Sequence, residues 1–225
     1  MTIENNLNKI SSSLPNGVKL IAVSKTKSNE EIMEAYRTGQ RIFGENKVQE
    51  LVRKWESLPK DIGWHFIGHL QSNKVRSIAP FIAMIHSIDS FKILKTINDE
   101  ARNAGRIIPC LLQFHIASEE SKFGFSYDEA FQLLSDIKLS ELENVIISGV
   151  MGMASFTDDT ELINKEFFTL HEIFQKLKDV FFQDNDNFRE ISMGMSHDYL
   201  IAIENGSTMV RIGSTIFGER NCVAN

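Results

Sequence analysis

A single lysine, Lys25, stands where a buried strand is predicted to end and a helix to begin. The apolar run of residues 20–23 ends just before it, and Ser28 with Glu31 three residues later forms the capping-box pattern of a helix start. An amine in such a turn is usually solvated and inert. If it is desolvated, its pKa falls and the neutral amine can form a Schiff base with an aldehyde. Lys25 is therefore a candidate for carbonyl chemistry.

Two turns near the C-terminus combine glycine with serine in a way that can hold a phosphate. The turns GMS (194–196) and IGST (212–215) follow apolar runs and precede helix-like stretches. Backbone N–H groups in such turns can face an anion, and Gly213 lets them approach it closely. Ser196 and Ser214 add hydroxyl donors. The same pattern is also typical of ordinary turns before helices, so the pattern alone leaves both interpretations open.

Arg211 lies between Val210 and Ile212 in the last apolar run. Side chains alternate along a strand, so Arg211 points away from the side that its two neighbours share. A buried arginine needs a partner, because an unpaired buried charge is very costly, and a structural ion pair would supply one. An amine, a phosphate-binding pair of turns and an inward arginine together also describe a pyridoxal phosphate site. There the lysine holds the aldehyde, the turns hold the phosphate and the arginine faces the ring nitrogen.

Eight short apolar runs rich in Ile, Val and Phe are predicted to be the strands that position these groups. They lie near residues 19–23, 41–43, 64–67, 82–86, 107–114, 145–150, 190–193 and 209–212. Amphipathic spacing predicts helices between most of them, and a leading helix near 2–12. Alternation of strand and helix predicts a parallel sheet, and eight repeats favour a closed (β/α)8 barrel over a doubly wound open sheet. In such a barrel the functional groups lie on the loops after the strands, which is where Lys25 falls.

Composition bounds the functions that this chain can have. With 42% apolar residues, 24% charged residues and a net charge of −6, residues 1–225 read as one globular domain that does not bind nucleic acid through phosphate contacts. We see no signal peptide, and no apolar run approaches the ~20 residues of a membrane span. Cys110 and Cys222 are far apart, which favours a reducing, cytoplasmic location. His65 and His69 straddle a strand end, so we expect no metal site.

Five segments in order resemble the pyridoxal phosphate homeostasis protein family. They are AVSKTK, FGENKVQE, WHFIGHLQSNK, EESKFGF and SMGMSHDYLIAIENGSTMVRIGSTIFGER, and the resemblance extends from about residue 3 to residue 221. It implies a monomeric (β/α)8 barrel with an extra N-terminal helix, similar to the N-terminal domain of alanine racemase, the fold type III of pyridoxal phosphate proteins. It also implies that pyridoxal phosphate is bound as an internal aldimine on Lys25.

The resemblance assigns further residues to the cofactor. Ser196, Gly213 and Ser214 are expected at the phosphate, and Arg211 near the ring nitrogen. Asn46 is expected close to the ring. Met193 is expected to line the pocket.

Two positions depart from the family pattern. His115, in LQFHI, stands where the family commonly has Asn, and Ser148, before GVMGMA, stands where it commonly has Arg. We expect both on the pocket wall opposite Lys25, where they bear on ligands other than the cofactor. Lys122, in EESKFGF, could face the site, although a polar loop at the surface is the simpler interpretation.

The resemblance implies a protein that holds pyridoxal phosphate and passes it to pyridoxal phosphate-dependent apoenzymes, without catalytic turnover. A racemase-like enzyme acting on amino acids is the alternative. Racemases of this class bring a second, β-rich domain and an acid–base residue from a dimer partner, and we expect the barrel to use the whole of this sequence. A Schiff-base aldolase that needs no cofactor is a third hypothesis.

Overall fold

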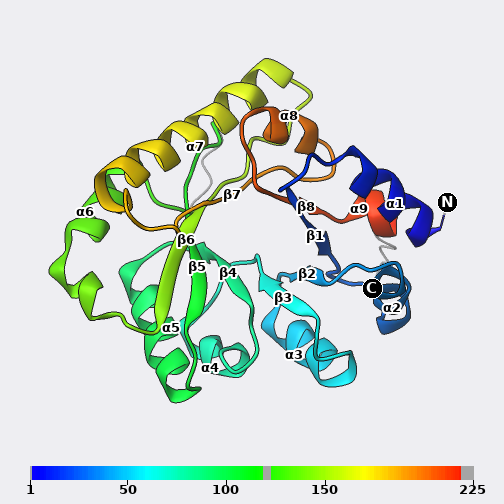
Figure 1. Ribbon diagram of the computed structural model, residues 1–225, viewed down its shortest axis with the longest axis horizontal. Helices are drawn as coiled ribbons and strands as arrows, with labels where there is room; N and C mark the ends of the chain where they lie inside the picture. Colours follow the sequence, from blue (N-terminus) through cyan, green and yellow to red (C-terminus); the bar gives the residue numbers. More distant parts are fainter. Residues whose placement is uncertain (1, 119–122, 219–225) are drawn as a thin grey trace.

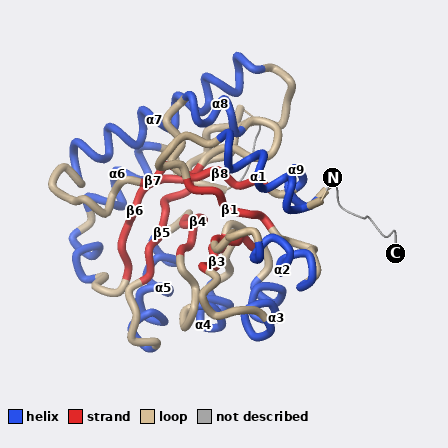
Figure 2. The backbone as a smooth tube through the Cα atoms, turned by 45° about the vertical axis from the view of Figure 1, so that its right-hand side comes forward, coloured by secondary structure: helices blue, strands red, loops and turns tan. Residues whose placement is uncertain are grey.

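The computed structural model describes residues 2–118 and 123–218. Within these residues, eight parallel strands close into a barrel in chain order, and β8 pairs with β1. The strands are β1 (Lys19–Val23), β2 (Ile42–Glu45), β3 (Gly63–Phe66), β4 (Met84–Ile88), β5 (Ile108–Gln113), β6 (Val145–Met151), β7 (Glu190–Ser192) and β8 (Met209–Ile212). They stand in the centre with the helices outside (Figures 1 and 2). The predicted (β/α)8 barrel is confirmed.

The helices follow the strands around the outside of the barrel. They are α1 (Ile3–Ser13), α2 (Asn29–Arg37), α3 (Val48–Ser57), α4 (Val75–Ile78), α5 (Phe91–Asn103), α6 (Tyr127–Ser135), α7 (Thr160–Phe181), α8 (Tyr199–Glu204) and α9 (Ser214–Phe217), with short 3₁₀ turns at Ser72–Lys74 and Ile137–Glu141. The leading helix α1 is present as predicted and packs against α2 and α9. None of the helices in these two ranges is long and apolar enough to cross a membrane.

Capping boxes begin two of the helices, and the first of them is the Ser28–Glu31 pattern predicted from the sequence. Ser28 accepts a hydrogen bond from the N–H of Glu31, whose carboxylate accepts one from the N–H of Ser28. The same reciprocal pair forms at Ser126 and Glu129, where α6 begins. The predicted start of β4 is two residues too early, because the N–H of Ile82 still bonds to the end of α4.

Alternation along the strands separates two apolar regions. The larger packs between the strands and the helices, and the smaller fills the barrel interior with Ile21, Met84, Leu111, Met151 and Met209. Arg211 pairs in register with Ile21, and register partners in neighbouring strands share a face. Arg211 therefore faces the interior, as predicted, while Val210 and Ile212 pack under the helices.

Candidate functional site

A cavity of about 320 Å³ opens where β1, β2, β7 and β8 end. Its lining residues are Val23, Lys25, Lys27, Asn46, Ile67, Met153, Phe156, Met195, Ser196, His197, Arg211, Gly213, Ser214 and Gly218. Lys25 continues the inward side of β1 that Ile21 and Val23 begin, and it is half-buried. Six residues that the sequence selected thus meet in one place: Lys25, Asn46, Ser196, Arg211, Gly213 and Ser214.

Met193 does not line this cavity. Its side chain is fully buried in the core under the helices, and Met195 lines the cavity instead. The reason is strand parity. Ser192 points inward, since its hydroxyl contacts Arg211, so the next side chain along the strand points outward.

Arg211 is anchored in the barrel by neutral acceptors. Its Nη1 donates to Ser192 Oγ at 2.7 Å, and its Nη2 donates to the carbonyl of Gly152 at 3.0 Å. The side chain forms no salt bridge with a carboxylate of residues 2–118 or 123–218, so the structural ion pair considered above is absent there. Burial lowers the pKa of Arg211 to about 10, with Asp198 acting in the opposite direction. The guanidinium therefore remains protonated at neutral pH.

Two buried histidines extend this anchor across the barrel. His86 Nδ1 lies 2.9 Å from Ser192 Oγ, and His86 Nε2 lies 2.9 Å from His65 Nδ1. Arg211 can only donate, so Ser192 Oγ accepts from Arg211. The Ser192 hydroxyl can then donate to His86 Nδ1, and the Nε2–H of His86 can donate to His65 Nδ1. Sequence analysis missed this chain. It considered His65 only beside His69 and rejected that pair as a metal site; Nδ1 of His69 lies 3.3 Å from Asp89 Oδ2.

The two histidines are expected to make the stability of the barrel depend on pH. Burial, with a smaller contribution from Lys19, lowers the pKa of His65 from 6.5 to about 3. Burial likewise lowers the pKa of His86, with His65 and Arg211 adding to the effect. Below pH 6.5, His65 and His86 therefore bind protons in the unfolded chain but remain neutral in the folded barrel. Stability is fully present above that pH and is lost as the pH falls towards the folded pKa values.

A His65→Gln variant tests this dependence. Each such histidine lowers the free energy of unfolding by about 1.4 kcal/mol per pH unit below its unfolded pKa. The free energy of unfolding is measured by urea titration at several values between about pH 6 and pH 5. Its decrease per pH unit should be smaller by this amount in the variant than in the wild type. His69→Gln is the control, because the side chain of His69 is 49% exposed. Equal slopes in the wild type and His65→Gln would contradict the assignment of a neutral His65.

The two serine-bearing turns lie against each other. The N–H of Gly213 donates to Ser196 Oγ at 3.2 Å, which joins the turn after β7 to the turn after β8. Gly194 has φ +91°, and a Cβ there would lie 2.6 Å from Cβ of Ala202, so glycine lets the turn pack on α8. Ser196, Gly213 and Ser214 from the two turns are thereby brought together in the lining of the cavity.

Asn46 lines the cavity and carries a buried acceptor atom. Its Oδ1 is buried and has no hydrogen-bond partner among the residues that the structure describes. Buried polar atoms are nearly always paired, so a donor from a ligand is the expected partner. This observation favours a bound group beside Asn46.

The two departures from the family pattern do not line the cavity. The Ser148 hydroxyl lies within β6, 3.5 Å from the carbonyl of Ile146. His115 follows β5, where its N–H donates to the carbonyl of Phe125. The expectation that both shape the wall opposite Lys25 is therefore wrong for the cavity as it stands. Lys122 lies outside the described residues.

Glu166 of α7 ties two loops at the rim of the barrel. Its carboxylate accepts hydrogen bonds from the N–H and hydroxyl of Ser118, after β5, and from the N–H and hydroxyl of Ser155, after β6. Burial raises the pKa of Glu166, but these hydrogen bonds together outweigh it and leave the pKa below 4.5. The ionised carboxylate thus holds the loop that carries Met153 and Phe156.

Comparison with known proteins places this fold and cavity in a family. Residues 1–221 match the family model described as the N-terminal domain of alanine racemase. The pyridoxal phosphate homeostasis protein of Haemophilus influenzae is 39% identical over 234 residues, covering 98% of this chain and 97% of the relative. This chain belongs to the pyridoxal phosphate homeostasis protein family.

Solved structures agree with membership of the pyridoxal phosphate homeostasis protein family. PipY of Synechococcus elongatus without pyridoxal phosphate superposes with a TM-score of 0.90 at 35% identity, covering 96% of this chain and 100% of PipY. PipY with pyridoxal phosphate bound gives 0.87 at 34% identity, with the same coverage. Alanine racemase of E. faecalis gives 0.75 at 16% identity, covering 97% of this chain and 58% of the racemase, and so shares the fold.

Proposed function

We propose that this protein binds pyridoxal phosphate at the cavity, takes part in intracellular pyridoxal phosphate homeostasis, and uses Lys25 as the covalent attachment point. The observation that carries the proposal is the meeting of an amine, a buried guanidinium and two donor-rich turns in one cavity. Membership of the family supports it, as does the bound pyridoxal phosphate in PipY.

The residues present fit this cofactor. Bound pyridoxal phosphate would supply an aldehyde at this site, and the amine of Lys25 would be the group that holds it covalently. Ser196 and Ser214 donate hydroxyl hydrogens to the phosphate, together with N–H groups of their turns. Arg211 would lie beside the ring nitrogen as a cation and would disfavour a second positive charge there.

The proposal extends to how the protein works in the cell. We propose that residues 1–225 act as one monomeric domain in the cytoplasm, and that pyridoxal phosphate-dependent apoenzymes receive the cofactor. The relatives are named for homeostasis rather than for a reaction, which supports a carrier role.

Absorption spectroscopy with chemical trapping tests the attachment. The protein is loaded with pyridoxal phosphate, and its spectrum is recorded before and after borohydride, which reduces a C=N bond to a stable amine. Peptide mass mapping is then expected to find the adduct on Lys25. An adduct on Lys27 or Lys74 in its place would contradict the assignment, and absence of any visible band would favour the cofactor-free aldolase.

A racemase-like activity is the second candidate, because one observation favours it. His197 lines the same cavity as Lys25, so a second titratable group is within the site. Racemisation needs an acid and a base on opposite faces of the α-carbon. It also needs an electron-poor ring, and the cationic Arg211 opposes protonation of the ring nitrogen and weakens that electron sink.

We therefore expect no multiple-turnover racemisation. The loaded protein is incubated with L-alanine in deuterium oxide, and the α-deuterium content and chirality of the alanine are measured. The amount of D-alanine should not exceed the amount of protein. Many turnovers that disappear in both Lys25→Ala and His197→Phe would show that the protein is an enzyme. His115→Ala serves as the control outside the cavity lining.

A further inference from the structure

We infer that Glu50 and Lys54 of α3 are positioning residues for Lys25, because they hold the backbone immediately before and after it. The inference rests on the proposed function, in which Lys25 is the attachment point. Neither residue touches the cofactor in this scheme. They act by fixing the turn from which the Lys25 side chain enters the cavity.

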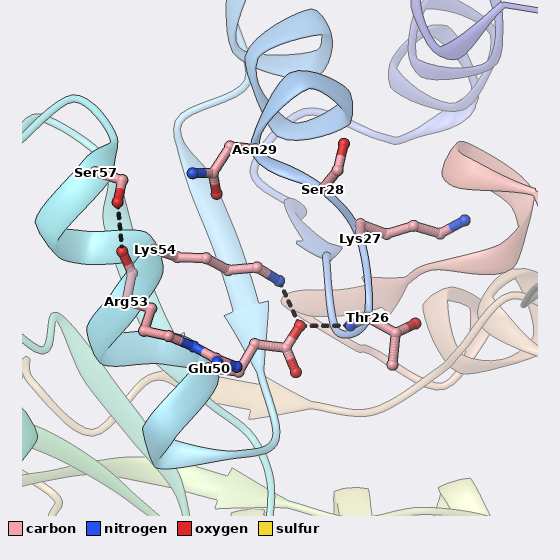
Figure 3. Close-up of a pocket in the computed structure, with 8 residues that line it drawn as sticks. All are labelled: Thr26, Lys27, Ser28, Asn29, Glu50, Arg53, Lys54 and Ser57. Carbon is pink, nitrogen blue, oxygen red and sulfur yellow. Dashed lines mark hydrogen bonds and ion pairs between the residues drawn. The ribbon is translucent and has the colours of Figure 1, made fainter. Parts of the chain in front are cut away.

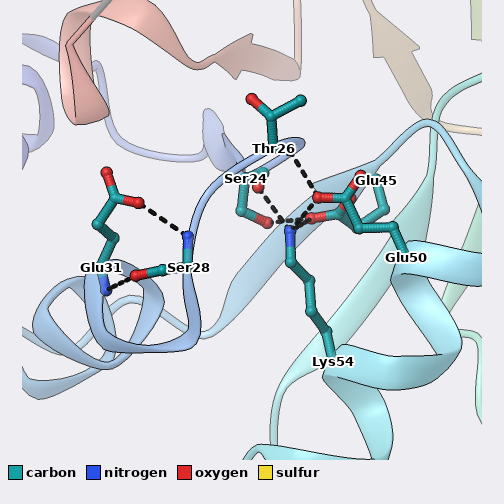
Figure 4. A network of polar contacts seen from close by, with 7 residues as sticks. All are labelled: Ser24, Thr26, Ser28, Glu31, Glu45, Glu50 and Lys54. Atoms are coloured by element: carbon teal, nitrogen blue, oxygen red, sulfur yellow. Dashed lines mark hydrogen bonds and ion pairs between the residues drawn. The ribbon is translucent and has the colours of Figure 1, made fainter. Parts of the chain in front are cut away.

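The residue before Lys25 is held by Lys54 (Figure 4). Lys54 Nζ donates to the carbonyl of Ser24 at 2.7 Å and to Glu45 Oε1 at 2.8 Å. The hydroxyl of Ser24 donates to the same oxygen of Glu45 at 2.6 Å. Both the main chain and the side chain of Ser24 are therefore fixed to groups from α3 and β2.

The residue after Lys25 is held by Glu50. The N–H of Thr26 donates to Glu50 Oε1 at 2.6 Å, and the same oxygen accepts from Lys54 Nζ at 2.7 Å. Glu50 and Lys54 are thereby linked to each other and to both neighbours of Lys25. The side chain of Lys54 is only 6% exposed and that of Glu50 15%, so the ion pair between them is largely shielded from water.

The conformation of Thr26 shows why the turn needs such support. Thr26 has φ +66° and is the one non-glycine residue with positive φ among residues 2–118 and 123–218. This region is disfavoured for a β-branched residue, and it persists where the surroundings fix it. The N–H of Lys27 bonds to the carbonyl of Ser24 at 3.0 Å and closes the turn, and the bond from Thr26 to Glu50 ties the strained residue to α3.

Polar contacts bridge the space between this turn and α3. A second cavity, of about 610 Å³, is lined on one side by residues 26–29 and on the other by Glu50, Arg53, Lys54 and Ser57. Figure 3 shows Glu50 bonded to the N–H of Thr26, with Lys54 bonded to the same carboxylate. The turn is thus attached to α3 at this point by hydrogen bonds and charge.

The energetics of the cluster favour positioning over stability. Glu45 is fully buried, and its Oε2 has no hydrogen-bond partner in the described parts of the chain. Burial raises the pKa of Glu45, and attraction to Lys54 only partly offsets this. Desolvation cancels much of the gain from a buried ion pair, so such a cluster contributes little net stability. What it does provide is directional contacts on both sides of Lys25.

Paired substitutions at Glu50 test the inference. Glu50→Gln keeps a carbonyl oxygen to accept from Thr26, whereas Glu50→Ala removes the acceptor. The first readout is the rate at which added pyridoxal phosphate gives a borohydride-trapped adduct on Lys25. The second uses the protein before loading and is amide hydrogen exchange at Thr26, followed by NMR.

Glu50→Ala is expected to slow adduct formation by about 10- to 100-fold, because a misplaced reactive group loses its near-attack geometry. Hydrogen exchange at Thr26 should accelerate by about tenfold or more, since its acceptor is gone. Glu50→Gln should keep both rates within about threefold of the wild type, since the acceptor remains. Lys54→Met, which releases the Ser24 carbonyl, should slow adduct formation independently.

Leu94→Ala is the matched control for lost stability. Leu94 is fully buried in the core on α5, so the variant loses packing without touching the turn. It should leave both rates unchanged, and a slowing equal to that of Glu50→Ala would overturn the inference. Wild-type rates in Glu50→Ala would overturn it as well. Failure of the proposed function is distinguishable, because the wild type itself would then carry no adduct on Lys25.

Discussion

Lys25→Ala is expected to abolish borohydride-stable attachment of pyridoxal phosphate while the barrel stays folded. The C=N bond needs the side-chain amine of Lys25, and alanine has no nitrogen to replace it. Folding should survive, because Lys25 follows the end of β1 and its side chain adds nothing to the apolar core. Mass mapping after borohydride measures the attachment, and thermal unfolding measures the fold.

Lys27→Ala is the matched control for this loss. Lys27 lines the same cavity, but its Nζ donates to the carbonyl of Phe217 and lies 3.3 Å from Glu31. We expect Lys27→Ala to retain the adduct. If both variants lost the adduct to the same extent, attachment would not depend on Lys25 in particular, and its assignment would be wrong.

Removing the phosphate from the ligand is expected to have the second large effect. Pyridoxal should bind at least about 100-fold more weakly than pyridoxal phosphate, because charged hydrogen bonds contribute about 1.5–3 kcal/mol each and the two turns supply several. Spectroscopic titration of the same protein with each compound measures the two affinities. Equal affinities would contradict a phosphate site on these turns.

The serine hydroxyls should account for part of this preference. Ser196→Ala combined with Ser214→Ala is expected to weaken pyridoxal phosphate binding about tenfold, while backbone N–H groups keep the remainder. Ser135→Ala is the control, since Ser135 is an exposed residue of α6 whose hydroxyl donates to the carbonyl of Phe131 in the same helix. Pyridoxal itself should bind the double variant and the wild type alike.

The sequence alone predicted the parts of this molecule that follow from local rules. The alternation of apolar runs with helix-like spacing predicted the barrel. The apolar residues on either side of Arg211 predicted that its side chain points into the barrel. Lys25 could be selected because a barrel concentrates function at the ends of its strands. Each of these inferences needs only a few consecutive residues and a general rule of the fold.

Other features depend on the closure of the barrel and could not be read from a short window. His65, His86 and Ser192 are far apart in sequence and meet because β3, β4 and β7 face one interior. Lys54 fits the polar side of an amphipathic helix, yet the structure buries its ammonium beside Glu45. The four residues of α4 are too few to show a helical period.

The four hydrogen bonds on Glu166 have a consequence for how the rim of the barrel can move. One carboxylate joins Ser118 and Ser155, so neither residue can move outward without breaking its own hydrogen bonds or pulling the other residue with it. Phe156, whose side chain is 81% exposed, lines the cavity and directly follows Ser155, so an outward movement of Phe156 would pull on the hydrogen bonds between Ser155 and Glu166.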